Sequence, residues 1–100
     1  MWIYESHIGG LYVSKYPKSF YDLYCNQCNN CDNQIGVFDN AKEFLEFYAD
    51  EIDCEDGCGG YAFGYIFKFM KDNFKDFHMT WDEMKKFVID NRSNNEQIYE

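Results

Sequence analysis

The stretch YCNQCNNC, residues 24–31, carries three cysteines at two-residue spacings and is the strongest indication of how this chain folds. A second pair, Cys54 and Cys58, follows after 22 intervening residues. Five cysteines cannot all pair within one chain, and clustered thiols in a reducing compartment favour metal over disulfides. Zinc takes four soft ligands, and two tight loops can each supply two. The sequence therefore predicts a structural Zn²⁺ bound by Cys25, Cys28, Cys54 and Cys58.

Other arrangements of the thiols remain open from the sequence. Cys31 has the same spacing from Cys28 as Cys25 has, so it competes with one of the chosen ligands. His7 and His78 are alternative donors, and unligated thiols, redox-active thiols or disulfides are alternatives to a metal. A catalytic zinc is not expected, because four thiolates leave no position at which water is activated.

Extended segments are predicted on both sides of the first cysteine loop. Trp2–Tyr4 and Leu11–Val13 flank Gly9 and Gly10, which is typical of a β-hairpin. Residues 35–38 are expected to form a short strand, whereas residues 19–24 fit either a helical turn or a strand.

Three helices are expected in the second half of the chain. The first is capped by Asp39 or Asn40 and runs to about Ile52, because its apolar residues follow a 3.6-residue repeat. These residues are Ala41, Phe44, Leu45, Tyr48 and Ile52. The second follows Gly60 and ends near residue 73 or 74, and the third begins at Thr80 with a capping box to Glu83.

The predicted fold class is therefore α+β, with a small N-terminal antiparallel sheet and a Cys zinc site packed on three C-terminal helices. A chain of 100 residues is expected to form one domain, here a zinc-stabilised domain over residues 1–100. In this prediction the zinc joins the strand region to the loop between the first two helices.

Composition excludes several classes of protein. A content of 46% hydrophobic and 21% aromatic residues is incompatible with a disordered chain. Eighteen acidic against nine basic residues give a formal net charge of −9, which disfavours direct binding to nucleic acid. No apolar stretch approaches the 20 or so residues of a membrane span, and the N-terminus lacks the features of a signal peptide. A cytoplasmic location is expected.

Most of the negative charge falls in one segment, residues 39–56, which holds eight acidic residues and one basic residue. One reading is simply a solvated helix face. The other is a surface that mimics part of a phosphate backbone and binds a Lys/Arg-lined protein channel. The predicted partner-binding residues are Glu43, Glu46, Phe47, Asp50 and Asp53. Phe47 is either the aromatic anchor of that surface or the edge of the core.

Three stretches resemble small acidic proteins encoded by phages and prophages of Gram-positive bacteria: residues 1–14, residues 23–28 and the later Ile35-Gly36. Some proteins of this kind are anti-CRISPR inhibitors of type II-A RNA-guided nucleases, and this chain looks like a metal-binding example. The recurrent feature is the pair Cys25 and Cys28. The resemblance implies a host CRISPR effector nuclease as the protein partner, with loading of target DNA blocked.

Three other functions compete with this expectation. An adaptor that binds a different protein shares every feature of the sequence. A zinc-ribbon nucleic-acid binder would need a basic face beside the metal, and residues 39–58 are acidic instead. No enzyme is expected, since 70 residues separate the two histidines and no catalytic motif is present. The expected assembly is a monomer or weak dimer with no membrane contact.

Overall fold

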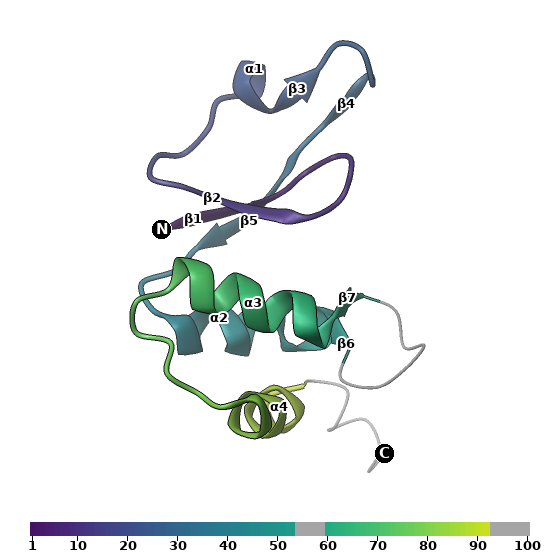
Figure 1. The fold of residues 1–100 in the computed structure, drawn as a ribbon. Coiled ribbons are helices and arrows are strands. Elements are labelled where there is room, and N and C mark those ends of the chain that lie inside the picture. The colour runs from purple at the N-terminus through teal and green to yellow at the C-terminus, as the bar shows by residue number, and fades with distance from the viewer. Residues whose placement is uncertain (54–59, 93–100) are drawn as a thin grey trace, which may run out of the picture. The chain divides into compact units, whose positions relative to one another are not determined.

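The computed structural model describes residues 1–53 and 60–92, and the chain divides into two compact units, Met1–Asp39 and Asn40–Glu100. The order of elements along the chain can be followed in Figure 1. Within the described ranges no helix combines the length and the apolar character needed to cross a membrane.

The first unit contains a three-stranded antiparallel sheet in the order β2-β1-β5. Strand β1 (Trp2–Glu5) pairs with β2 (Leu11–Ser14), and its other edge pairs with β5 (Asn33–Val37). The predicted hairpin is confirmed: Gly9 and Gly10 adopt positive φ angles of 99° and 94°, which glycine tolerates at the turn. The turn between β1 and β2 therefore holds residues 6–10 close to the sheet edge.

The cysteine loop of the first unit is a second, smaller hairpin. A single helical turn, α1 (Phe20–Leu23), leads into β3 (Tyr24–Cys25), which pairs antiparallel with β4 (Asn30–Cys31). Ser19 and Asp22 form a reciprocal capping box that starts α1. Residues 19–24 thus contain both alternatives left open by the sequence, a helical turn followed by a strand.

The second unit contains the three predicted helices, α2 (Ala41–Tyr48), α3 (Phe63–Asn73) and α4 (Trp81–Asp90). Asn40 caps α2 by accepting the Glu43 N–H, and Thr80 forms the predicted capping box with Glu83. The α+β class is confirmed, with the antiparallel sheet in the N-terminal unit and these helices in the C-terminal one.

Helix α2 ends four residues earlier than the sequence predicts. After Tyr48 the chain forms a 3-10 turn over Ala49–Glu51 and then β6 (Ile52–Asp53), which pairs in parallel with β7 (Tyr61–Ala62). The apolar repeat continues to Ile52, but pairing with a strand nine residues away requires extended backbone there. Long-range backbone hydrogen bonds therefore override the local helical preference.

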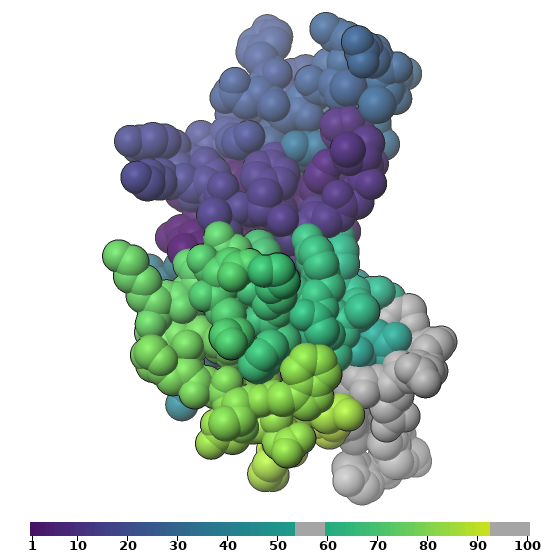
Figure 2. All heavy atoms as spheres, in the orientation of Figure 1, coloured from purple at the N-terminus to yellow at the C-terminus, as the bar shows by residue number. Residues whose placement is uncertain are grey.

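Aromatic side chains fill the core of the second unit. Phe44 of α2 lies against Tyr48, Phe69 and Phe74 with ring centroids 5.1–6.0 Å apart. Trp81 of α4 contacts Phe63 and Phe67 of α3. In the space-filling view the side chains of α3 and α4 lie directly against one another (Figure 2).

Gly60, at the start of β7, cannot be replaced without loss of stability. Its φ is +82°, and an added Cβ would collide with the backbone carbonyl of Glu51. We expect Gly60→Ala to lower the free energy of unfolding by about 2 kcal/mol or more, since left-handed backbone alone costs about 1–2 kcal/mol. Urea denaturation of the full chain measures this loss.

Gly64 provides the matched control, because it lies in α3 and an added Cβ would meet Trp81 at an ordinary 3.5 Å. Gly64→Ala should leave the unfolding free energy unchanged or raise it by up to about 1 kcal/mol, because alanine is the better helix former. Equal unfolding midpoints for Gly60→Ala and Gly64→Ala would contradict the close approach of Gly60 to the Glu51 carbonyl.

Candidate functional site

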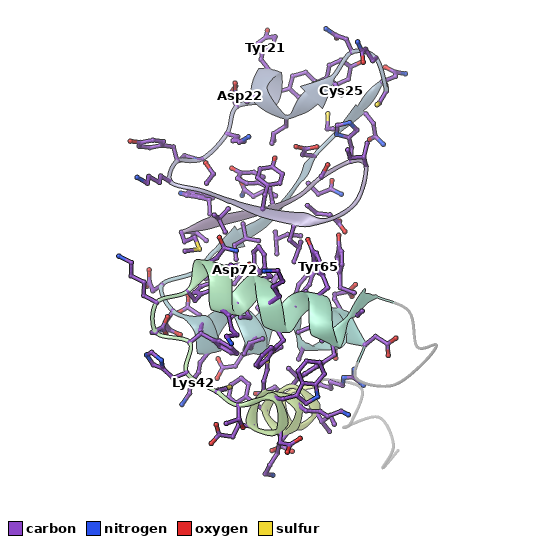
Figure 3. All side chains as sticks on the ribbon, in the orientation of Figure 1. Tyr21, Asp22, Cys25, Lys42, Tyr65 and Asp72 are labelled. Atoms are coloured by element: carbon purple, nitrogen blue, oxygen red, sulfur yellow. The ribbon has the colours of Figure 1, made fainter. Side chains whose placement is uncertain are left out.

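Three metal-ligating side chains of the first unit converge although they come from two separate turns. His7 lies in the turn between β1 and β2, Cys25 on β3 and Cys28 in the turn that follows β3. Their ligand atoms all lie within 4.8 Å of one another. Figure 3 shows the Cys25 sulfur on the side of the small hairpin that faces the strands of the larger sheet. The cluster therefore joins the two hairpins of this unit.

The backbone of the small hairpin favours a thiolate at Cys25. Asn29 adopts a left-handed φ of 52°, a conformation that asparagine tolerates better than most residues. Hydrogen bonds from Cys28, with a further backbone contribution from Gln27 and a contact with His7, lower the pKa of the Cys25 thiol. The neighbouring Cys25 sulfur raises the pKa of Cys28. The hydrogen bonds between the two cysteines thus favour the thiolate on Cys25 rather than on Cys28.

The carboxylate of Asp32 orients the imidazole ring of His7. Its Nδ1 lies 2.6 Å from Asp32 Oδ1, and its backbone N–H donates to the same oxygen at 2.9 Å. The hydroxyl of Tyr12, on β2, donates to Asp32 Oδ2 at 2.5 Å. This hydroxyl holds the pKa of Asp32 down at about 2, and the bond to Asp32 raises the pKa of His7. The side chains of His7 and Asp32 are only 16% and 15% exposed.

The structure brings together part of the predicted ligand set. Cys25 and Cys28 are in the cluster, whereas Cys54 and Cys58 lie outside the described residues. Cys31 pairs with Tyr24 in the β3–β4 ladder while Cys25 pairs with Asn30, so Cys31 and Cys25 project from opposite faces of the hairpin. This parity explains why Cys31 is not in the group.

His7 is the member that sequence reasoning did not select. It lies 18 residues before Cys25 and has no metal-ligand spacing of its own, so only the fold places it there. The other histidine, His78, is exposed in the second unit between α3 and α4. The signal that could have pointed to His7 is its place at the tip of a predicted hairpin, beside Gly9 and Gly10.

The predicted partner-binding residues lie mostly on the solvent side of α2. Glu43, Glu46 and Asp50 are exposed, and Phe47 between them is 63% exposed. Asp53 is half-buried in β6. The opposite face of α2, with Ala41, Phe44, Leu45 and Tyr48, is buried. Phe47 is therefore largely exposed and is not one of the buried residues of the core.

The chemistry available differs between the two units. Two thiols and an imidazole are the donor types that zinc prefers, and an imidazole held by a carboxylate through its other nitrogen is the usual outer arrangement of such ligands. The face of α2 offers carboxylates and one aromatic ring, which suit a cationic protein surface. Comparison of the chain with protein-family models, curated proteins and solved structures gave no match, so both sites are interpreted from their own geometry.

Proposed function

We propose that this chain is a stoichiometric inhibitor that binds a basic, nucleic-acid-binding surface of another protein through the exposed face of α2. The observation that carries the proposal is the combination of three exposed carboxylates, Glu43, Glu46 and Asp50, with the exposed ring of Phe47. Spacings of three and four residues put Glu43, Glu46 and Phe47 on the same side of α2, and Asp50 follows in the 3-10 turn after the helix. Together they form a surface that we call the acidic face.

Most charged residues in the segment 41–53 are acidic. Residues 41–53 contain five acidic residues and a single basic one, Lys42. A basic channel that has evolved to hold phosphates attracts such a surface, and this attraction speeds association. The second unit carries the acidic face on a helix whose other side is firmly packed, so the carboxylates are presented without an ordering cost for the backbone.

Phe47 is expected to supply binding affinity, to which charged residues contribute less. Charged groups at an interface contribute chiefly to association rate and specificity, whereas buried aromatic side chains account for much of the affinity. A ring that is 63% exposed in the free protein has apolar area to lose on binding. We therefore assign Phe47 as the anchor and the carboxylates as the charged surround.

The specific target that the family resemblance implies is a type II-A RNA-guided nuclease. Such nucleases hold the guide–target heteroduplex in a positively charged channel and contact the displaced strand through Lys and Arg. A small acidic protein bound there would exclude target DNA without any chemical step. A protein-interaction adaptor without a CRISPR role is the alternative that the experiment below distinguishes.

The test is cleavage of target DNA by the guide-loaded nuclease with increasing amounts of this protein. The triple variant Glu43→Lys, Glu46→Lys, Asp50→Lys should inhibit about 10–1000-fold less effectively, since electrostatic steering changes association rates by that range. Inhibition by the wild type should also weaken as salt rises, because charges are screened over about 8–10 Å at physiological ionic strength.

The matched control is Asp72→Lys, Asp82→Lys, Asp90→Lys, which changes net charge equally at exposed positions of α3 and α4. This control should inhibit nearly as well as the wild type. Equal loss in both triple variants would mean that only overall charge matters. Full inhibition by the α2 variant would exclude the acidic face, and no inhibition of any type II-A nuclease by the wild type would leave the adaptor function.

A further inference from the structure

We propose that His7 Nε2, Cys25 Sγ and Cys28 Sγ are three ligands of a zinc ion, with Asp32 and Tyr12 as the groups that orient His7. This assignment is independent of any partner protein. It adds an imidazole from the β1–β2 turn to Cys25 and Cys28, two of the four ligands expected from the sequence. The other two expected ligands, Cys54 and Cys58, lie outside the described residues.

The separation of the donors suits a tetrahedral metal. Zinc binds sulfur at about 2.3 Å and nitrogen at about 2.0–2.1 Å, so its ligand atoms lie about 3.5–4 Å from one another. The three donor atoms of the cluster already lie within 4.8 Å of one another. Closing on an ion therefore requires these separations to shorten by at most about 1.3 Å, which rotation of the Cys28 side chain in its exposed turn can supply.

The hydrogen bonds fix which nitrogen of His7 is free. Asp32 lies 2.6 Å from Nδ1, so Nδ1–H donates to the carboxylate and the lone pair of the neutral ring is on Nε2. The Tyr12 hydroxyl and the His7 backbone N–H also donate to Asp32, so the carboxylate itself is held by groups from strand β2 and from the β1–β2 turn. A carboxylate–histidine pair of this kind both orients a metal-binding ring and raises its basicity.

The first unit also has a structural need for a cross-link. Its buried residues are only Ile3, Tyr4, Leu11 and Phe38, and none of residues 12–37 is buried. Units below about 40 residues usually depend on a metal, disulfides or oligomerisation, because they bury too little apolar surface. A metal bound by His7, Cys25 and Cys28 ties the small hairpin to the sheet, which the few buried side chains of this unit do not do.

A metal fits these observations better than a disulfide between Cys25 and Cys28. A disulfide would occupy both sulfurs and leave the oriented imidazole without a partner, whereas zinc uses all three donors. Thiolates with imidazole select zinc among the abundant divalent ions.

The experiment is a zinc competition titration of the full chain under reducing conditions, with a chromophoric chelator as competitor. The wild type should bind one zinc. His7→Ala should weaken affinity more than about 100-fold and Asp32→Asn by about 10–100-fold, the range found for outer-shell partners of metal-bound histidine. His78→Ala, the exposed histidine of the second unit, should bind as the wild type does.

His7→Cys keeps the assignment testable even if the alanine variant does not fold. With cobalt in place of zinc, the thiolate-to-metal charge-transfer band should grow, because one more thiolate binds the metal than in the wild type. Wild-type affinity in His7→Ala, or an unchanged cobalt band in His7→Cys, would exclude His7 as a ligand. A reduced wild type that binds no zinc, or a Cys25–Cys28 disulfide that persists with reductant, would overturn the site.

Discussion

Removing the zinc proposed above should abolish the fold of residues 1–39 while the helices of the second unit persist. Structural zinc in small peptides contributes about 10–16 kcal/mol at neutral pH, as much as the net stability of a whole domain. The first unit buries only four residues, so little else would hold its small hairpin. Amide NMR spectra before and after chelation should therefore lose dispersed signals from residues 1–39 alone.

Two cysteine variants separate metal loss from other effects of the chelator. Cys25→Ser removes a proposed ligand and should reproduce the spectrum of the chelated protein. Cys31→Ser is the matched control, because Cys31 projects from the other face of the same hairpin and should retain both zinc and fold. A chelated chain with fully dispersed signals from residues 1–39 would show that these residues fold without metal.

Replacing Phe44 by alanine should lower the free energy of unfolding of the second unit by about 3–5 kcal/mol. The side chain is fully buried, and its ring lies 5.1 Å from that of Tyr48 and 6.0 Å from that of Phe74, measured between centroids. The loss combines the transfer of the ring to water with the cavity left among neighbours that cannot close around it. Chemical denaturation monitored by helix circular dichroism measures it.

Phe47 gives an unusually close control, since it is the same residue type three positions along the same helix but is 63% exposed. Phe47→Ala should change the unfolding free energy by less than about 0.5 kcal/mol. The same variant should weaken inhibition if Phe47 anchors the partner. Similar destabilisation by the two alanine variants would contradict the burial pattern of α2.

Local signals in the sequence predicted most elements because the groups that determine them lie within a few residues of one another. Asn40 and Thr80 each place an oxygen where the first backbone N–H groups of a helix need an acceptor, and both helices begin there. Gly9 and Gly10 supply the positive φ angles of the β1–β2 turn in the same way. The acidic face followed equally directly, because the 3.6-residue repeat of α2 separates its apolar and charged residues.

The pairing of distant segments was not available from the sequence. The end of α2 at Tyr48 is decided by the parallel pairing of Ile52 with Tyr61, and the helical repeat carries no information about that partner. The Arg92 guanidinium also donates to the carbonyl of Ile52, which lies 40 residues earlier in the chain. Contacts between residues so far apart in the sequence compete with the local helix propensity. Which of the two prevails depends on the packing of the whole unit.

By itself, the sequence determined the β1–β2 turn, the starts of α2 and α4 and the acidic face, and it predicted Cys25 and Cys28 as a pair of metal donors. Only the tertiary structure decided that His7 joins them, that Asp32 and Tyr12 orient it, and that Cys31 faces away. The reason is physical: a two-residue spacing creates a local pair of sulfurs, whereas a third donor is set by strand pairing and by the alternation of side chains across a ladder.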